Sequence, residues 1–309
     1  KYGKNTRPNS DKTELYADKS GLVKIFDGKI MVNDVYEVPN HVGNSTGDVD
    51  FDGSVVIHGN VITGFTVKAK GDVEVMGVVE GATVIAGGNI VLHSGIQGMG
   101  KSRVESGGDL QTKFIEQANV VCGGDIQSEA ILHSEVSGKG TVSVEGKKGL
   151  ISGGTVRAGI SVSARILGSH LGTATDIEVG IDPLILAEYN DLRKGLPKMI
   201  EEADKLEKVI LLLNKRKEME GDLDEQKAEM YKSAVRNKVF LANKIAISQK
   251  RVDELQEEVD NRNAGIVTVQ GSVYPGVKVG IGSIYHFIKD EIKYVKLYKD
   301  GADIKMTAL

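Results

Sequence analysis

The first 180 residues repeat a short pattern of glycine, a small polar residue and alternating aliphatic residues. Residues 71–75 read GDVEV and residues 88–92 read GNIVL. Further copies begin at Gly53, Gly108 and Gly124, so the copies are spaced by 18, 17, 20 and 16 residues. Alternation with a period of two predicts short β-strands with one buried face. Glycines between them predict tight corners, where an Asp or Asn side chain can bond nearby backbone amides.

Strands this short, separated by one or two corner residues, fit a solenoid better than a hairpin meander. Each turn of roughly 16–20 residues would stack on the last at about 4.8 Å, and the inward aliphatic side chains would form one continuous core. We therefore expect a mainly β fold, a right-handed parallel β-helix. A β-sandwich is the alternative, but sandwiches normally have longer strands and more aromatic residues.

A long antiparallel helical hairpin is predicted for the charged part of the chain. Asp182 and Pro183 suit a helix cap and a first helical turn. Apolar residues then recur at alternating steps of three and four over residues 189–213, stop at a turn signal in residues 219–222, and resume over residues 231–259. Two helices of roughly 35 residues joined by a tight turn pack antiparallel, and each would be about 50 Å long.

The hairpin is expected to be an insertion in the solenoid, because an antiparallel hairpin returns the chain to the point where it left. The β repeat resumes after it, in residues 266–273 and 277–282. From residue 183 to residue 262 there are 16 Lys and Arg residues and 17 Asp and Glu residues. This near-balance is typical of a solvated coiled coil. Pro197 lies inside the first helix and is expected to kink it.

The chain is therefore expected to divide into four segments, which are an N-terminal β segment and cap (1–46), a parallel β-helix (47–182 and 264–283), an inserted antiparallel helical hairpin (183–263) and a C-terminal β-hairpin cap (284–309). Asp-Gly pairs beginning at Asp27 and Asp300 predict tight hairpin turns. Residues 21–39 and 284–307 are expected to cap the solenoid, because its edge strands and apolar ends need covering.

Composition supports this division and narrows the class of protein. Of 38 glycines, 27 lie between Gly43 and Gly180, and Trp is absent, so the core must be built from aliphatic residues. A net charge of −4 gives no basic field to attract nucleic acid or anionic lipid. No apolar run is long enough for insertion across a membrane. The single cysteine, Cys122, excludes an internal disulfide and fits a cytoplasmic location.

Candidate ligand sites are few. The six histidines have no zinc-motif spacing, so no metal site is predicted. Residues 95–102 read GIQGMGKS and match the phosphate-loop pattern, which makes Lys101 and Ser102 candidates for nucleotide binding. That motif works only where a helix N-terminus holds the phosphate, and residues 103–109 re-enter the β repeat instead. A polysaccharide-binding face is a further alternative, although aromatic residues to stack sugars are scarce.

Seven segments resemble the flagellar assembly protein A family, which also carries the unknown-function domain label DUF342. They are residues 35–39 (VYEVP), 45–51 (STGDVDF), 71–82 (GDVEVMGVVEGA), 113–116 (KFIE), 129–134 (EAILHS), 168–173 (GSHLGT) and 271–277 (GSVYPGV). The resemblance covers nearly the whole chain. It implies a cytoplasmic bacterial protein, linked in some members to flagellar assembly, with no known catalytic residue. Members usually carry a further N-terminal domain, which this sequence does not show.

Residues 71–100 are more distantly similar to the C-terminal β-helical domain of the cell-division inhibitor MinC. That domain binds its membrane ATPase partner through an Arg-Ser-Gly-Gln motif. The aligned positions here are Ile62, Thr63, Gly64 and Phe65, so the arginine is missing and that partnership is not implied.

Together the patterns favour a non-enzymatic scaffold or adaptor that works through protein–protein contacts of the β-helix and the coiled coil. No catalytic residue and no cofactor is expected. Flagellar assembly, or organisation of the cell pole or septum, is the expected setting, and a nucleotide- or polysaccharide-binding protein is the alternative. Val209, Leu211 and Leu212 lie off the helical seam. They predict either a homo-oligomer through the hairpin or a broader interface within it.

Overall fold

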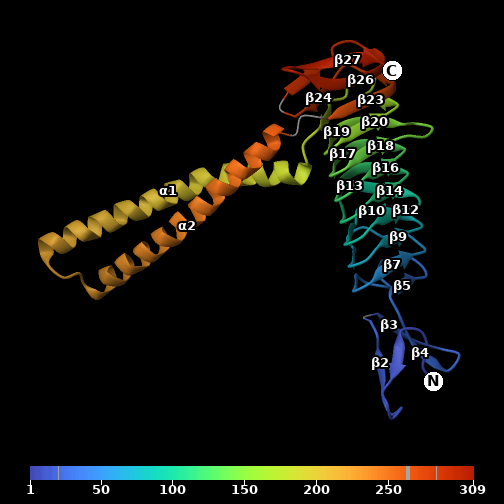
Figure 1. Cartoon of the computed structure of the whole chain (residues 1–309), viewed down its shortest axis with the longest axis horizontal. Coiled ribbons are helices and arrows are strands. Elements are labelled where there is room, and N and C mark those ends of the chain that lie inside the picture. Colours follow the sequence, from blue (N-terminus) through green and yellow to red (C-terminus); the bar gives the residue numbers. More distant parts are fainter. Residues whose placement is uncertain (20, 262–264, 283) are drawn as a thin grey trace. The chain divides into compact units, whose positions relative to one another are not determined.

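The computed structural model describes residues 1–19, 21–261, 265–282 and 284–309. These residues divide into two compact units (Figure 1). One unit holds their β-strands, and the other consists of two long helices, α1 (Pro183–Glu220) and α2 (Glu225–Asn261). The division falls where the composition of the chain changes from glycine-rich to charged.

The β unit is a parallel β-solenoid with three faces, which confirms the predicted architecture (Figure 1). On each face a strand pairs in parallel with the equivalent strand of the next turn. The first face consists of β5 (Val35–Val38), β7 (Ser54–Ile57), β9 (Val73–Val75), β12 (Ile90–Leu92), β14 (Leu110–Thr112), β16 (Ile126–Ser128), β18 (Thr141–Val144), β20 (Ser161–Ala164) and β23 (Ile266–Val273).

Several strands of the other two faces are longer, because one strand bends at a corner and serves both faces. The second face consists of β6 (Val49–Phe51), β8 (Thr66–Ala69), β11 (Thr83–Ala86), the C-terminal parts of β13 (Gly95–Ser106), β15 (Phe114–Cys122), β17 (Ala130–Gly138) and β19 (Leu150–Ala158), and then β22 (Thr175–Val179) and β24 (Val277–Ile281). The third face consists of β10 (Val78–Glu80), the N-terminal parts of β13, β15, β17 and β19, and β21 (Ile166–Leu167).

The aliphatic residue of each repeat copy becomes one layer of the core. Val55, Val73, Ile90, Leu110 and Ile126 each follow the glycine and polar residue of a copy, and the strand registers of the first face stack them in this order. Each is at most 1% exposed. Burial of one such side chain contributes about 1.5–3 kcal/mol. A core without tryptophan can therefore hold this fold.

In the copies that begin at Gly71, Gly88, Gly108 and Gly124 the glycine is needed because a polar side chain of the previous turn fills the space beside it. Asn89 Oδ1 accepts the N–H of Asp109 at 2.8 Å, and Asp109 Oδ1 accepts the N–H of Asp125 at 2.8 Å. A Cβ on Gly108 would lie 2.2 Å from Asn89 Oδ1, and a Cβ on Gly124 would lie 2.1 Å from Asp109 Oδ1. The Asp and Asn side chains thus bond the backbone amides of the next corner, as predicted.

The helical hairpin is inserted at one corner between the second and the first face. In the preceding turns two or three residues connect these faces, whereas here β22 ends at Val179 and β23 begins at Ile266. Gly180 and Gly265 nevertheless touch, because a Cβ on Gly265 would lie 2.7 Å from the Gly180 nitrogen. The Gly180 N–H donates to the carbonyl of Ala158 at 3.2 Å. The backbone ladder therefore continues past the insertion.

The hairpin unit is held by the seam that the heptad pattern predicts. α1 and α2 run antiparallel, because Glu188 contacts Arg251 and, further along α1, Glu207 contacts Lys238. The seam residues buried between them include Tyr189, Leu196, Leu213, Ala234, Leu241, Ser248 and Leu255. α1 runs as one helix through Pro197. At the turn Asp224 caps α2, where its Oδ1 accepts the N–H of Lys227 at 2.8 Å.

The solenoid begins earlier than the sequence pattern indicates. β3 (Leu22–Phe26) and β4 (Lys29–Asn33) form the predicted hairpin at Asp27 and Gly28, and β1 (Thr6–Pro8) pairs with β2 (Leu15–Ala17). β5, however, is already paired in parallel with β7, so the first turn starts at Val35 and not at residue 47. The alternation of residues 35–38 looks the same in a hairpin arm and in a solenoid strand, and only the pairing partner separates them.

At the C-terminal end antiparallel strands replace the parallel ones. β25 (Ile284–Phe287) pairs with β24, β26 (Ile292–Asp300) pairs with β23, and β27 (Asp303–Ala308) pairs with β26. The turn between β26 and β27 contains Gly301 at a φ of +61°, as expected for an Asp-Gly turn. Since β26 lies along β23, the last strand of the first face has a partner on both sides.

Candidate interaction surfaces

Lys101 and Ser102 lie within β13, and no helix follows them. Ser102 is buried, and its Oγ accepts the N–H of Ala82 at 3.1 Å. The described chain continues from β13 directly into β14. A phosphate loop needs a helix N-terminus beyond its Lys and Ser. This stretch therefore has the residues of that motif without its geometry.

The corner beside Lys101 is held in an unusual backbone conformation. Met99, Gln117 and His133 occupy this corner in three successive turns, and their φ values lie between +47° and +53°. Non-glycine residues in this conformation cost on the order of 1–3 kcal/mol each and cluster at functional sites. They border a hollow of about 780 Å³ that is also lined by Lys101, Arg103, Asn119 and Glu135. Its charged lining consists of two basic side chains, Lys101 and Arg103, and one acidic side chain, Glu135.

A second hollow, of about 460 Å³, runs along the first face over four turns. One side of this groove is formed by Val91, Gln111, Gln127 and Ser143, which stack in register. The other side is formed by His93, Lys113, Glu129 and Glu145. The second row places a hydrogen-bonding side chain in each of the four turns, roughly 4.8 Å apart, and such a row suits an extended polar chain.

The described residues offer little nucleophilic or metal chemistry. Among them, no three His, Cys, Asp or Glu side chains gather closely enough to hold a metal ion. His170 Nε2 lies 3.0 Å from the hydroxyl oxygen of Tyr274. Cys122 is buried, and its Sγ donates to the carbonyl of Gly108 at 3.0 Å. Burial raises the pKa of the Cys122 thiol, which makes it a poor nucleophile.

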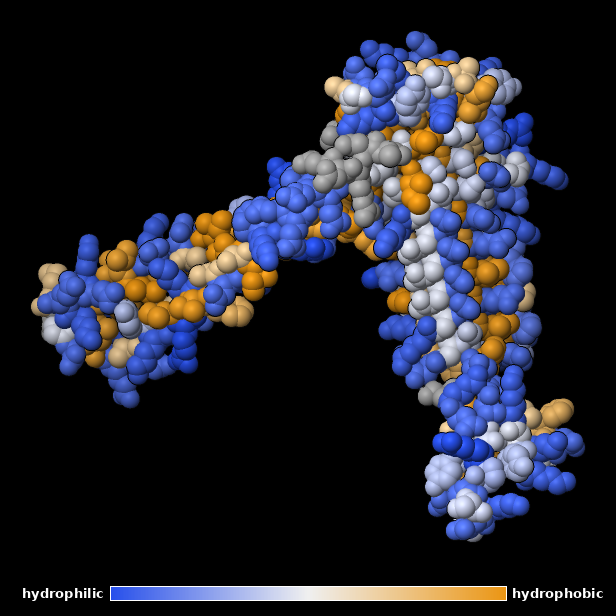
Figure 2. Space-filling model, in the orientation of Figure 1, coloured by the Kyte–Doolittle hydropathy of each residue, from blue (hydrophilic) through white to orange (hydrophobic). Residues whose placement is uncertain are grey.

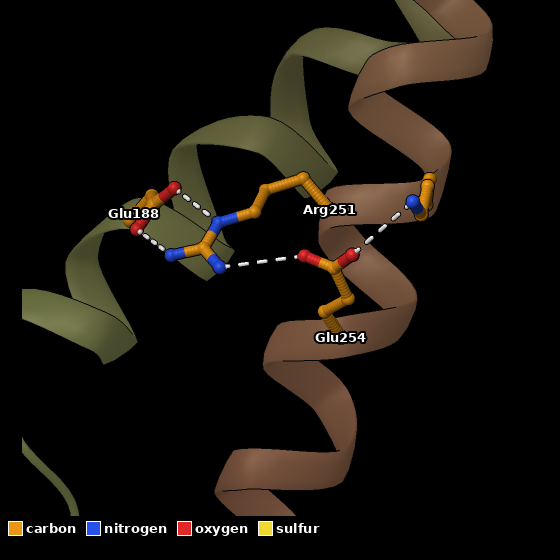
Figure 3. A network of polar contacts seen from close by, with 4 residues as sticks. Glu188, Arg251 and Glu254 are labelled. Atoms are coloured by element: carbon orange, nitrogen blue, oxygen red, sulfur yellow. Dashed lines mark hydrogen bonds and ion pairs between the residues drawn. The ribbon is translucent and has the colours of Figure 1, made fainter.

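An ion pair connects the two helices of the hairpin (Figure 3). Arg251 of α2 donates from Nε to Glu188 Oε1 at 2.8 Å and from Nη2 to Glu188 Oε2 at 2.9 Å. Arg251 Nη1 lies 3.5 Å from Glu254 Oε2. These hydrogen bonds lower the pKa of Glu188 and raise that of Arg251. The group is solvent-exposed, so it adds little to the stability of the hairpin. Its main effect is to set which sides of the two helices face each other.

The hairpin also carries large apolar side chains that its seam does not bury (Figure 2). Leu211 is 52% exposed and Leu212 is 68% exposed, as expected for residues off the seam. Val239, Phe240 and Ile247 of α2 are 56%, 66% and 72% exposed. The sequence prediction missed these three, although their heptad positions would have identified them. Neither α1 nor α2 is apolar enough along its length to cross a membrane.

The chain matches one family model over most of its length. The match covers residues 34–304 and is to the flagellar assembly protein A β-solenoid domain. Comparisons with curated proteins and with solved structures gave no match. The matched range begins just before β5 and includes both helices of the hairpin, so it takes in the solenoid together with its insertion.

Proposed function

Because this chain belongs to the flagellar assembly protein A family, we propose that it is a non-enzymatic cytoplasmic scaffold or adaptor in flagellar assembly. It acts through protein–protein contacts made by the solenoid faces and by the helical hairpin. Two features of the described residues support this role. The conspicuous candidate nucleophile, Cys122, is buried, and the hydroxyl of Ser102 is engaged by the backbone of a neighbouring turn.

The observation that carries the proposal is the construction of the hairpin. The backbone ladder runs from Ala158 to Gly180 and from Val179 to Gly282, so the solenoid is continuous without the helices. The chain still devotes Leu184–Arg262 to a separate compact unit whose surface keeps large apolar side chains. An element that the core does not need, and that exposes apolar surface, is typical of a binding surface.

The proposal is tested by replacing residues 183–262 with a short Gly-Ser linker. Since Gly180 and Gly265 touch, we expect the shortened chain to keep β-type circular dichroism and a cooperative thermal transition. In cells that normally make this protein, we expect the shortened chain to abolish flagella, counted by electron microscopy, while the full chain expressed from the same site restores them. Normal flagella with the shortened chain would overturn the role of the hairpin.

A surface variant covers the case in which the shortened chain does not fold. Ile247→Glu combined with Val239→Glu keeps both helices and changes only exposed positions. We expect this variant to keep its helical circular dichroism and to reduce the number of flagella. An unchanged number of flagella in the folded variant would show that these apolar residues have no part in the role.

Nucleotide binding through Lys101 is the competing function. We expect calorimetry with ATP and magnesium to show no binding, because the hydroxyl of Ser102 is buried and accepts a backbone N–H. Micromolar binding that is lost in Lys101→Ala would replace the scaffold proposal.

Polysaccharide binding is the second candidate, and the groove on the first face favours it. Its test is retention of the protein on columns of neutral and acidic polysaccharides. Retention that Gln111→Ala combined with Gln127→Ala removes would support a glycan-binding role for these two residues of the groove.

A further inference from the structure

The groove on the first face of the solenoid contains a row of charged side chains in three consecutive turns. Lys113, Glu129 and Glu145 directly follow β14, β16 and β18, and the registers of these strands place them one above another (Figure 1). The Glu129 N–H donates to the carbonyl of Lys113 at 2.9 Å, which holds the two residues one turn apart. All three residues are exposed and line the groove. In the direction of the chain the row therefore reads basic, acidic, acidic.

The charges of this row are available to a ligand. Among the residues that the structure describes, Lys113 and Glu129 have no side-chain hydrogen bond or ion pair. His93, which lines the groove one turn before Lys113, differs from them, because its Nε2 lies 2.7 Å from Glu74 Oε1. The uncommitted charges of the groove thus begin at Lys113.

The row ends at Glu145. Arg165 holds the equivalent place in the next turn, but it does not line the groove, and its Nη1 donates to the carbonyl of Lys147 at 3.4 Å. Ser143 Oγ donates to Glu145 Oε1 at 3.0 Å, which keeps the carboxylate beside the groove. The groove therefore has a basic end and an acidic end.

The other side of the groove carries uncharged hydrogen-bonding groups. Gln111 and Gln127 stack in register, in the turns of Lys113 and Glu129. Both glutamines are exposed, and no described residue bonds their side chains. Each side-chain amide carries N–H donors and a carbonyl acceptor, as a peptide backbone does. A peptide in the groove can therefore make hydrogen bonds on one side and ion pairs on the other.

We infer that the groove binds an extended peptide of a partner protein that carries the order acidic, any, basic, any, basic, in either chain direction. The acidic side chain pairs with Lys113, and the two basic side chains pair with Glu129 and Glu145. Alternate side chains of an extended chain point to the same side, so the residues between them face the glutamines. This inference rests on the proposed function, because it states the chemistry of a partner for one face of the solenoid.

The dimensions of the groove suit such a peptide. From Lys113 to Glu145 the row spans about 10 Å at about 4.8 Å per turn, and the three charged residues of the peptide span about 13 Å at about 3.3 Å per residue. The difference of about 3 Å is small for Lys, Arg and Glu side chains, which have several rotatable bonds. Because the ion pairs are exposed, each adds little, and the contact is weak and transient.

The order of the charges favours a peptide over a polysaccharide. A polysaccharide repeats one short unit, so its pattern of charge is the same at every place along its length. One basic and two acidic neighbours in successive turns instead require a chain whose charge changes sign once, which a peptide sequence can supply. Among the described residues that line the groove, none is Phe, Tyr or Trp, whose ring faces would stack on sugars.

The test is fluorescence anisotropy of labelled peptides mixed with the full chain at low ionic strength, where exposed charges are least screened. The peptides ETRTR, RTRTE and RTETR, blocked at both ends, have the same composition and net charge. We expect saturable binding of ETRTR or RTRTE below about 1 mM, and the one that binds better gives the chain direction. RTETR should bind about 2- to 30-fold more weakly, because it places its acidic residue opposite Glu129 and loses two exposed ion pairs.

A charge swap supplies the decisive variant. Lys113→Glu combined with Glu129→Lys makes the row acidic, basic, acidic at unchanged net charge, so this variant should prefer RTETR. The matched control is Lys68→Glu combined with Glu37→Lys, which makes the same exchange at exposed positions outside the groove and should bind as the unchanged chain does. The β-type circular dichroism of each variant shows that it is folded.

Three results would overturn the inference. They are no binding of any of the three peptides, even where the chain is retained on a polysaccharide column; equal affinities for all three peptides; and an unchanged preference in the swapped variant. Each of them leaves the scaffold proposal standing, because that proposal is tested on the hairpin and by counting flagella.

Discussion

Gly108→Ala tests the reason for the glycine in the copies of the repeat that follow the first one. The new Cβ would lie 2.2 Å from Asn89 Oδ1 and 3.2 Å from Asn89 Cγ, while the nearest backbone atom, the Asn89 nitrogen, is 3.4 Å away. The new Cβ therefore clashes with one side chain and not with the backbone. Asn89 must turn aside, and its hydrogen bond to the N–H of Asp109 is lost.

The expected cost follows from these contacts. Loss of one hydrogen bond costs about 0.5–1.5 kcal/mol. A displaced side-chain rotamer costs a similar amount, about 0.5–1.5 kcal/mol. Replacing glycine by alanine where the backbone permits it returns about 0.4–1 kcal/mol, because the unfolded chain has fewer conformations. Gly108→Ala should therefore destabilise the protein by about 1–2 kcal/mol. In the background of Asn89→Ala, where the obstructing side chain is gone, only the gain of about 0.4–1 kcal/mol remains, so Gly108→Ala should be slightly stabilising.

The measurement is a double-mutant cycle of the unchanged chain, Gly108→Ala, Asn89→Ala and the double variant. Unfolding by guanidinium chloride, followed through β-type circular dichroism, gives the four stabilities. We expect a coupling energy of about 1–3 kcal/mol, the sum of the two costs that depend on Asn89, with Asn89→Ala rescuing Gly108→Ala. Equal destabilisation by Gly108→Ala in both backgrounds would refute the reasoning, since the side chain of Asn89 would then not be the cause. A harmless Gly108→Ala would refute it as well.

Three further predictions concern the hairpin and the cysteine. Leu255 is fully buried in the hairpin, so Leu255→Ala should destabilise it by about 2–5 kcal/mol, seen as earlier thermal loss of helical circular dichroism. Arg251 lowers the pKa of Glu188, so their pair stabilises the hairpin above the ordinary carboxyl pKa and this contribution is lost as the pH falls through the lowered value. The melting temperature of the helices should therefore fall more steeply with acid in the unchanged chain than in Arg251→Ala. The thiol of Cys122, which is buried and has a raised pKa, should react with a thiol reagent only after unfolding, and rapid reaction in the folded protein would contradict its placement.

Local sequence patterns predicted most of the helices and strands, but they did not identify which strand each segment pairs with. The steps of three and four from Tyr189 to Leu213 depend only on neighbours along one helix, and they predicted the seam correctly. The alternation over residues 35–38 is equally local, but its meaning depends on a strand about 19 residues away, so the first turn was missed. For the phosphate-loop pattern around Lys101, the sequence already indicated that residues 103–109 return to the β repeat and do not start a helix. The structure places Lys101 and Ser102 in β13, between strands of the neighbouring turns.

The surfaces were harder to predict than the core. Leu211 and Leu212 were both recognised as lying off the seam, but successive residues point about 100° apart around a helix, so they face different sides of α1. Separating them requires the heptad position of each residue and the facing of the two helices. Phe240 and Ile247 were missed because a search for seam residues passes over the exposed positions of a helix. The facing itself comes from the contact between Glu188 and Arg251, which joins residues far apart in the sequence.

The insertion of the hairpin at a corner has a consequence for the order in which the chain folds. The 86 residues between Val179 and Ile266 replace a connection of two or three residues, which is about five doublings of loop length. Closing a disordered loop of that length would cost on the order of 3 kcal/mol more than closing the short one. The hairpin has local contacts and helices form within about a microsecond. Once it forms, its two ends are already together, and the turn from β22 to β23 closes as a short connection. We therefore expect weakening of the hairpin, as in Leu255→Ala, to delay the last turn of the solenoid and to leave the folding of the earlier turns unchanged.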